Sequence, residues 1–418
     1  MGKTISEKIF SNHCGKSVHA GELIVADIDA IMGQDGTSPL AIKVFEELGG
    51  ERVINNEKVL LVLDHSAPPP NEGVANLHKL MREFAEKYRT QISEIGEGVC
   101  HQVFMERGLA LPGNLIVGAD SHTCTYGALN CFATGVGSSE LAAVMYTGKL
   151  WFKVPETVKI ILNGKLRKGV TAKDIILYLV GYFKSDGLTY KAIEFEGEII
   201  KNLSFDGRAT ITNMVVEMGA KAGIMPFDEI TKNFFMEIGI NINEGVSSDE
   251  DAKFSAIYNF DLSNLEPQVS IPHQVDNVYP ISQLEKIKIH LAYIGTCTNG
   301  RMEDLRISAS LLKGKKIAKG VKMIIAPASK KIYLQALKEG LIETFLSAGA
   351  VVVNPGCGPC VGTHQGVPAD GENVISTANR NFKGRMGNNK AFIYLASPLT
   401  VTASAIKGEI TNPLDVMD

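Results

Sequence analysis

The sequence predicts an α/β fold of three α/β/α domains, each with a mostly parallel sheet, around a central cleft. Three observations lead to this prediction: short apolar segments recur along the chain, helical patterns lie between them, and polar residues follow several of the apolar segments directly. Buried parallel strands form nearly continuous apolar runs because helices cover both faces of the sheet. Ligands of such sheets bind at the carboxyl ends of the strands.

The predicted strands and helices alternate along the chain. The strands are expected at Val59–Leu63, Leu115–Val117, Val158–Leu162, Leu291–Ile294, Val321–Ile325, Ala350–Val353 and Phe392–Leu395. Between them lie apolar residues spaced three or four apart on one helix face, most clearly Val74, Leu77, Met81, Phe84 and Tyr88. A second helix is expected from Ser329 to Leu341, with Gly340 near its end.

Two changes in composition divide the chain into three domains. Charged, strand-like sequence begins near Pro155, and residues 264–283 contain several prolines among polar residues, as in a linker. The expected domains are therefore residues 1–154, 155–283 and 284–418, and each is large enough to fold around its own core.

The composition excludes several classes of protein. Of the 418 residues, 45% are hydrophobic and 21% are charged, and the formal net charge is −4. This balance argues against binding nucleic acid through phosphate neutralisation. No apolar run reaches the length of a membrane span, and the first ten residues do not resemble a signal peptide. Seven cysteines without a secretory signal argue against a disulfide framework, so we expect a cytoplasmic protein.

Two loops that follow predicted strands carry cysteines. Cys297 lies in Gly-Thr-Cys-Thr-Asn-Gly, and Cys357 and Cys360 form Cys-Gly-Pro-Cys. Spacing alone leaves open a thioredoxin-like dithiol, a structural zinc site with His364 as fourth ligand, an iron–sulfur cluster, or unassigned cysteines. The dithiol leaves Cys297 unexplained, and residues 361–366 are a poor helix start for such a motif. The other cysteines are expected to be inert: Cys14, Cys100, Cys124 and Cys131.

Carboxylate and imidazole residues also follow predicted strands. They are Asp64-His65, His101 and Asp120 with His122. A carboxylate beside a histidine fixes its tautomer and raises its basicity, so the imidazole can donate or accept a proton near neutral pH. A structural hydrogen bond is the alternative for each histidine.

Two further pairs of polar residues have no assignment from spacing alone. Asn213 and Glu217 are four residues apart, which on a helix most often means a solvated face. Arg380 and Arg385 flank a turn-rich segment, where surface charge is the ordinary explanation. Beside an open metal, two arginines would suit a di- or tricarboxylic acid.

Taken together, these segments resemble the aconitase superfamily. The matching motifs, in the family's order along essentially the whole chain, are Gly-Ala-Asp-Ser-His-Thr at 118–123, Gly-Thr-Cys-Thr-Asn-Gly at 295–300, Gly-Cys-Gly-Pro-Cys at 356–360, Asn-Arg-Asn-Phe at 379–382, Asp64-His65, Cys100-His101-Gln102 and Asn213 with Glu217. The resemblance is strongest to the large subunits of 3-isopropylmalate dehydratase and homoaconitase.

The resemblance implies a cofactor and a set of site residues. One [4Fe-4S] cluster per chain would be bound by Cys297, Cys357 and Cys360, leaving one iron without a protein ligand. Asp64 and His65 would protonate the leaving hydroxyl. The remaining roles implied are His101 paired with Asp120 and His122 paired with Glu217 in catalysis, Gln34, Ser121, Arg380 and Arg385 as contacts of the substrate carboxylates, and Asn213 and Asn379 beside the cluster.

The resemblance also implies a partner and a reaction. Single-chain aconitases continue into a swivelling fourth domain that supplies the serine base for the C–H proton, whereas this chain ends soon after Pro398, so we expect a separate small subunit. The expected hydro-lyase isomerises 2-isopropylmalate to 3-isopropylmalate in leucine biosynthesis. Homoaconitate, citraconate/2-methylmalate and 2,3-dimethylmalate are alternative substrates, and Gln34 stands where many isopropylmalate enzymes have histidine.

Two hypotheses from other classes remain to be tested. Some aconitases bind RNA when they lose the cluster, but the balanced charge and the lack of a basic aromatic stretch argue against RNA binding here. A thiol redox protein would expose reactive cysteines, whereas thiolates bound to iron should resist alkylation.

Overall fold

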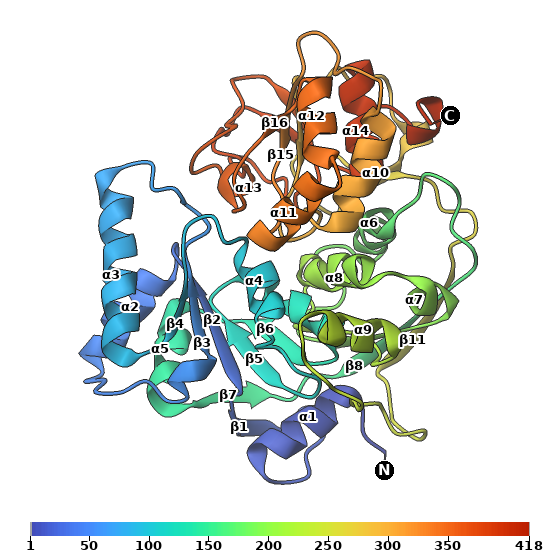
Figure 1. The fold of residues 1–418 in the computed structure, drawn as a ribbon. Coiled ribbons are helices and arrows are strands. Elements are labelled where there is room, and N and C mark those ends of the chain that lie inside the picture. Colours follow the sequence, from blue (N-terminus) through green and yellow to red (C-terminus); the bar gives the residue numbers. More distant parts are fainter. Residues whose placement is uncertain (1, 418) are drawn as a thin grey trace.

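The first sheet of the structure, a computed structural model that describes residues 2–417, is wholly parallel (Figure 1). Its strand order is β4-β3-β2-β5-β6. The strands are β2 (Ala30–Gln34), β3 (Val59–Val62), β4 (Gln91–Ser93), β5 (Leu115–Gly118) and β6 (Phe132–Gly135). The helices α2 (Ser38–Glu47), α3 (Glu72–Tyr88) and α5 (Ser138–Thr147) form a core with one face of the sheet, and α4 (Cys100–Glu106) forms a second core with the other.

A small antiparallel ribbon and a helix accompany this first sheet. The ribbon pairs β1 (Leu23–Asp27) with β7 (Lys149–Lys153), and α1 (Ile5–Cys14) contributes Ile9 and Phe10 to the same core as α2.

The second sheet has four parallel strands in the order β10-β9-β8-β11. They are β8 (Thr157–Asn163), β9 (Ala192–Glu196), β10 (Ala222–Ile224) and β11 (Ala256–Asp261). The accompanying helices are α6 (Ala172–Phe183), α7 (Glu198–Asn202), α8 (Phe205–Asn213) and α9 (Glu229–Glu237). The helix α6 is apolar on most of its surface because it is buried between this sheet and the third one.

The third sheet is mixed, with strand order β13-β12-β18-β17-β14-β15-β16. Its strands are β12 (Gln268–Ser270), β13 (Val278–Pro280), β14 (Leu291–Ile294), β15 (Lys322–Ile325), β16 (Val351–Val352), β17 (Asn373–Ser376) and β18 (Phe392–Leu395), of which β12 runs antiparallel to both neighbours. Its helices are α10 (Met302–Leu312), α11 (Lys330–Lys338), α12 (Leu341–Ala348), α13 (Gly358–Val361) and α14 (Pro398–Lys407).

The predicted apolar strands are all present, whereas the predicted linker at 264–283 is wrong. That segment supplies β12 and β13, which join the edge of the third sheet. Proline is tolerated at strand ends and on edge strands, because no ladder hydrogen bond is lost there, and Pro267 and Pro280 occupy such positions.

Helix α3 differs from its predicted face at one position. Met81, Phe84 and Tyr88 are buried as expected, but Leu77 is partly exposed and His78 is buried instead. His78 is drawn inward because its Nε2 lies 3.1 Å from the Asp35 carboxylate. The predicted second helix is present as α11, which begins after Ser329, whose side chain accepts the Ile332 N–H as an N-cap.

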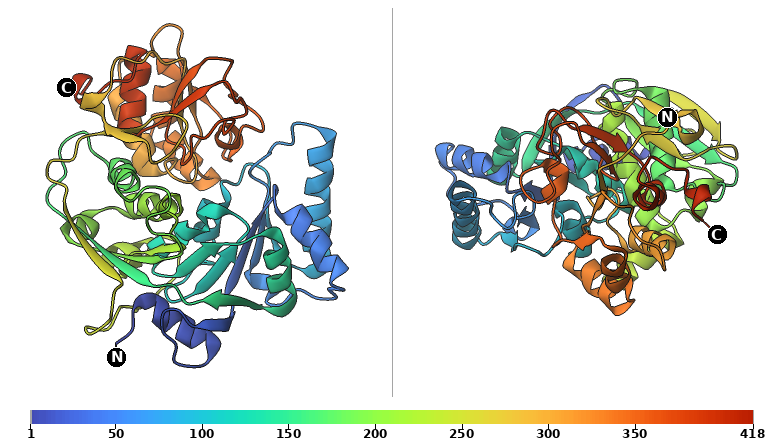
Figure 2. Two further views of the ribbon diagram at one scale, coloured as in Figure 1. Left: turned by 180° about the vertical axis from the view of Figure 1, so that it is seen from behind. Right: turned by 90° about the horizontal axis from the view of Figure 1, so that it is seen from above.

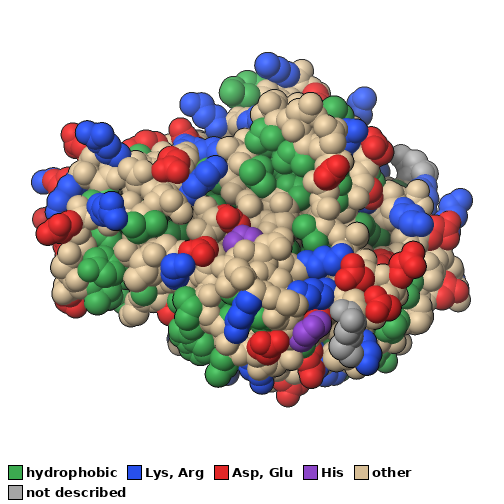
Figure 3. Space-filling model, turned by 90° about the horizontal axis from the view of Figure 1, so that it is seen from below, with side chains coloured by type: hydrophobic (Ala, Val, Ile, Leu, Met, Phe, Trp, Pro, Cys, Tyr) green, Lys and Arg blue, Asp and Glu red, His purple; other side chains and the backbone are tan. Residues whose placement is uncertain are grey.

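The three sheets with their helices meet at one central junction. In the two opposite views, the unit built on the third sheet lies across the units built on the first and second sheets (Figures 1 and 2). The face seen from below carries basic and acidic side chains side by side (Figure 3), in keeping with the small net charge. Among residues 2–417, we find no helix with the length and apolar character needed to cross a membrane.

Candidate active site

Asp35 fixes the loop that follows β3. Its carboxylate accepts hydrogen bonds from the backbone N–H groups of Asp64, His65 and Ser66 at 3.2, 2.7 and 2.9 Å. Burial alone would raise the pKa of Asp35, but the His78 hydrogen bond, the His65 charge and the backbone donors lower it to about 2. A permanently ionised Asp35 therefore holds the two predicted catalytic residues in place.

Asp64, His65, Asp120 and His101 form one continuous chain of polar contacts. The Asp64 carboxylate lies 2.9 Å from His65 Nδ1, and His65 Nε2 lies 3.5 Å from Asp120 Oδ2. Asp120 Oδ1 is 2.9 Å from His101 Nε2, whose other ring nitrogen is 3.2 Å from the Tyr126 hydroxyl. The two Asp–His pairs predicted from sequence thus meet through Asp120.

The electrostatics of this chain favour an ionised Asp120 and a protonated His65. Burial would raise the pKa of Asp120, but hydrogen bonds from His101, His122 and His65 hold it well below its usual range. Burial would lower the pKa of His65, but the charges of Cys357 and Asp64 and its hydrogen bonds raise it well above its usual range. His65 can therefore hold a proton at neutral pH.

A second series of polar contacts links the units built on the first and second sheets to the unit built on the third sheet. Glu217 lies 3.0 Å from His122 Nε2 and accepts a hydrogen bond from Arg380 Nε at 2.8 Å. Arg380 also donates to the Ser121 hydroxyl at 3.4 Å, and Ser121 is exposed. Burial would raise the pKa of Glu217, but His122 and Arg380 lower it. The solvated helix face expected for Asn213 and Glu217 is wrong, because α8 ends at Asn213 and both side chains turn into the junction.

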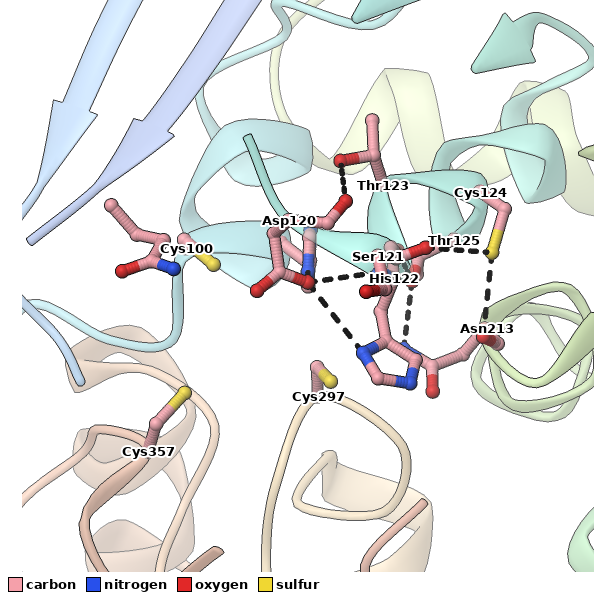
Figure 4. Close-up of polar contacts among 12 residues, drawn as sticks. Cys100, Asp120, Ser121, His122, Thr123, Cys124, Thr125, Asn213, Cys297 and Cys357 are labelled. Carbon is pink, nitrogen blue, oxygen red and sulfur yellow. Dashed lines mark hydrogen bonds and ion pairs between the residues drawn. The ribbon is translucent and has the colours of Figure 1, made fainter. Parts of the chain in front are cut away.

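The three predicted cluster cysteines come from two loops of the third unit. Cys297 follows β14, and Cys357 is the residue before α13, whose single turn contains Cys360. All three are buried free thiols. Figure 4 shows Cys297 below Asp120 and His122, with Cys357 below Cys100, so these two thiols face the predicted catalytic residues of the first unit. The Cys-Gly-Pro-Cys sequence does open a helix, contrary to expectation, but Gly362 ends it after one turn.

Hydrogen-bond donors contact two of the three thiols, and the third, Cys357, donates to Asp64 Oδ2 at 3.3 Å. Asn379 Nδ2 donates to Cys297 Sγ at 3.4 Å, and Arg385 Nη2 donates to Cys360 Sγ at 3.2 Å. The Arg385 Nε and the Tyr293 hydroxyl are buried and have no partner among the described residues. Unpaired buried donors beside several sulfurs fit an electron-rich group held between those sulfurs.

Burial keeps the predicted ligand thiols protonated unless a cation is bound. Burial, followed by the charges of Cys360 and Asp120, raises the pKa of Cys297 to about 12. Burial and the Asp64 charge raise the pKa of Cys357 well above its usual range. Thiolates in such a place need a bound cation, which a cluster iron supplies. Cysteine sulfur is the ligand type of iron–sulfur clusters, so the donor set fits one.

Two remaining predicted site residues are Asn213 and Gln34. Asn213 Oδ1 accepts hydrogen bonds from Thr298 at 3.1 Å and Asn379 at 3.4 Å, which ties it to the cysteine loop. Gln34 is buried at the end of β2, where its side chain accepts the Gly36 N–H. Asn213 therefore lies beside the loop of Cys297, whereas the role of Gln34 as a substrate contact stays a prediction.

Cys100 was expected to be inert, but it packs with Cys297 and Cys357 in one buried cluster. Its sulfur, an Asp64 oxygen and a His65 nitrogen lie within 4.8 Å of one another, so the three could hold a metal ion. Of the other cysteines predicted to be inert, Cys131 is buried and Cys14 is half-buried, whereas the buried Cys124 thiol donates to the Asn213 carbonyl oxygen at 3.4 Å.

Sequence reasoning missed two buried basic side chains that bind backbone carbonyls at the site. The Arg301 guanidinium donates to the carbonyl oxygens of Cys297 at 2.7 Å and Thr298 at 2.8 Å, and to Gln102 Oε1 at 2.9 Å. Lys173 Nζ donates to two carbonyl oxygens directly before Asn379, at 2.9 and 2.8 Å. Neither residue lies in a recognisable motif, and no local signal distinguishes them from surface cations.

Comparisons with known proteins show the family and the fold of the chain. The sequence profile of the aconitase family (aconitate hydratase) matches residues 7–286 and 282–408. A crystal structure of Thermococcus kodakaraensis aconitase X in its holo-form aligns with a TM-score of 0.51 over 88% of each chain, at 14% identity, which shows a shared fold.

Curated relatives are similar over their full length. The 3-isopropylmalate dehydratase large subunit 2 of Archaeoglobus fulgidus is 51% identical over 421 residues, covering 100% of both chains. The corresponding large subunit 1 of Thermotoga maritima is 50% identical over 99% of both chains. A protein of Methanosarcina mazei, named "Probable methanogen homoaconitase large subunit", is 52% identical over 93% of this chain and 99% of its own.

Proposed function

The chain belongs to the aconitase family, and from that premise we propose that it is the large subunit of a 3-isopropylmalate dehydratase. It would bind one four-iron cluster through Cys297, Cys357 and Cys360. The observation that carries the proposal is the contact chain from Asp64 through His65 and Asp120 to His101, which faces these buried thiols.

The proposed reaction removes water from 2-isopropylmalate and adds it back to give 3-isopropylmalate. When bound, the cluster supplies a Lewis-acidic iron that polarises the substrate hydroxyl. His65 donates the proton that hydroxide needs in order to leave, and Asp64 fixes the imidazole through the 2.9 Å contact at Nδ1. Asp120 orients both His65 and His101, so the proton donor is already in place when substrate binds.

The substrate carboxylates need cationic partners in the same pocket. Arg380 and Arg385 supply guanidinium groups, with Gln34 and Ser121 as neutral contacts. Glu217 holds Arg380 at 2.8 Å and His122 at 3.0 Å, so one carboxylate positions groups from two units. The positive charge stabilises the dianion that develops when a proton leaves the carbon beside a carboxylate.

A separate small subunit is the proposed source of the base for that C–H proton. Support comes from the relatives that the chain matches from end to end, which are named large subunits. The exposed Ser121 beside Arg380 marks the accessible edge of the site, where a partner could reach the substrate. We place the complex in the cytoplasm, since a reducing compartment suits seven free thiols.

The test is reconstitution under anaerobic conditions followed by turnover. The loaded chain should contain four irons and four sulfides and should isomerise 2-isopropylmalate only when its small subunit is added. A chain that binds no cluster, or one that is fully active alone, would refute this assignment. As a control, Cys124→Ser removes a buried thiol outside the predicted ligand set, so this variant should still bind the cluster.

The second candidate is homoaconitase, favoured by the Methanosarcina mazei relative at 52% identity and by Gln34. Parallel assays with homoaconitate, citraconate and 2,3-dimethylmalate would separate these substrates. A kcat/KM higher for any of them than for 2-isopropylmalate would reassign the substrate without changing the reaction class.

A further inference from the structure

Tyr293 is a fully buried residue of β14 whose hydroxyl has no hydrogen-bond partner among the described residues. Buried tyrosine hydroxyls nearly always have a partner, because an unpaired polar group loses its hydration without compensation. Phenylalanine would fill the same space without this loss. The hydroxyl therefore points to a partner that belongs in the pocket.

The hydroxyl lies on the cysteine side of the third sheet. Ala292 and Ile294 pack into one core of that sheet, whereas Tyr293 packs into a different core that contains Cys360. A Cβ atom on Gly295 would come within 2.8 Å of the Tyr293 hydroxyl oxygen, so this oxygen lies against the start of the loop that carries Cys297.

The surrounding charges keep the phenol protonated. Burial, together with the negative charges of Cys360, Cys357 and Cys297, raises the pKa of Tyr293 well above its usual range. A buried phenol with no partner among the described residues offers a hydrogen-bond donor, and this one lies against the loop that carries Cys297.

We propose, on the basis of the proposed function, that the Tyr293 hydroxyl donates a hydrogen bond to a sulfur of the cluster and thereby raises its reduction potential. The acceptor is a cysteine sulfur or an inorganic sulfide. Hydrogen bonds to the sulfurs set the potentials of iron–sulfur clusters, because they stabilise the more negative, reduced state. Asn379 and Arg385 already donate to cysteine sulfurs, and Tyr293 adds a neutral donor from the strand itself.

The test is Tyr293→Phe, which removes one oxygen atom and leaves the ring. The matched control is Tyr394→Phe, on β18 of the same sheet, where the side chain packs in the core away from Cys360. Both variants are reconstituted anaerobically, checked for iron, sulfide and thermal unfolding, and titrated electrochemically with detection by electron paramagnetic resonance.

We expect the ratio of reduced to oxidised cluster at a fixed potential to fall about tenfold in Tyr293→Phe, equivalent to a shift of about 59 mV to lower potential. Tyr394→Phe should leave the ratio unchanged. Resonance Raman bands of the cluster should shift less between H₂O and D₂O in Tyr293→Phe than in the wild type. An unchanged potential in a fully loaded Tyr293→Phe would overturn the proposal.

A measurement without substitution covers the case in which Tyr293→Phe does not fold. Replacing all tyrosines by 3-fluorotyrosine makes the phenol a stronger donor, so the potential should rise, and no rise would refute the hydrogen bond. These outcomes are separate from failure of the proposed function, in which even the wild-type chain would bind no cluster.

Discussion

Asp120→Asn would remove a charge from the centre of the site while keeping the shape of the side chain. Asp120 Oδ1 lies 2.9 Å from His101 Nε2 and accepts the His122 N–H at 2.8 Å, and Oδ2 lies 3.5 Å from His65 Nε2. Asparagine has one acceptor oxygen, so its amide nitrogen must face one of these groups. At least one imidazole therefore loses its orienting partner.

The magnitude follows from the one imidazole contact that asparagine cannot keep. A hydrogen bond to a charged group contributes about 1.5–3 kcal/mol of positioning. If all of this free energy is expressed in the transition state, kcat falls by about 10- to 150-fold. The assay is steady-state isomerisation by the loaded complex at equal iron content. A kcat within threefold of the wild type would refute the role of Asp120.

The stability of the variant should depend on pH in a defined direction. The pKa of Asp120 is held well below its usual range by three histidines, against the effect of burial. Such a carboxylate stabilises the fold above its ordinary pKa, and this contribution disappears as pH falls towards the lowered value. The difference in unfolding free energy between wild type and variant should therefore shrink below about pH 4.

Asp29→Asn is the matched control for this prediction. Asp29 also pairs with a histidine, since its Oδ2 lies 2.6 Å from His13 Nε2, and it accepts the Leu115 N–H at 2.8 Å. This pair lies outside the site, so the control should lose stability and keep its kcat.

The remaining predictions concern the framework of the site. Gly127→Ala should prevent stable folding, because its Cβ would lie 1.7 Å from the Gly223 carbonyl oxygen, and the measurement is soluble yield and thermal unfolding. Arg301→Met should lower iron content and reduce the unfolding free energy in urea by about 2–6 kcal/mol, because two buried carbonyls, including that of Cys297, lose their donor. Burial lowers the pKa of Lys173 to about 7, so between about pH 7 and pH 10 the unfolded chain binds more protons than the folded one. The unfolding free energy of the wild type should therefore rise over this pH range, and Lys173→Met should abolish the rise. An unchanged pH profile of the unfolding free energy in the variant would contradict this.

The sequence predicted strands best where burial leaves a continuous apolar run. Leu291–Ile294 and Phe392–Leu395 match β14 and β18 residue for residue, because helices cover both faces of these central strands. The strand β2 was missed, since its Ala-Ile-Met-Gly-Gln sequence includes a glycine and ends in a polar residue. Its burial comes from neighbours on both sides, which the local sequence does not contain.

Site residues were predictable where chemistry and motif coincide. Asp64-His65 and Cys-Gly-Pro-Cys carry their residue types side by side, whereas Glu217 gains its role only when α8 ends and the chain turns towards His122. Arg301 supports the site through backbone carbonyls of its own loop, those of Cys297 and Thr298. Carbonyl groups are present at every residue, so no sequence pattern marks the ones that need a cation.

The exposed fraction of each side chain distinguishes the residues that contact substrate from the residues that hold them in position. The His101 side chain is 2% exposed, Asp120 15% and Arg380 25%. Substrate must enter from the more exposed end, so side chains there contact substrate, and substituting them changes the unfolding free energy little. The buried side chains hold the exposed ones in position. Arg380→Lys should consequently raise KM with little change in unfolding free energy, because lysine keeps the charge and loses the fork that grips a carboxylate. His101→Ala should instead lower the unfolding free energy and kcat together, since it leaves a buried cavity and removes the partner of Asp120. If both variants lowered the unfolding free energy equally, exposure would not be the property that distinguishes binding residues from positioning residues.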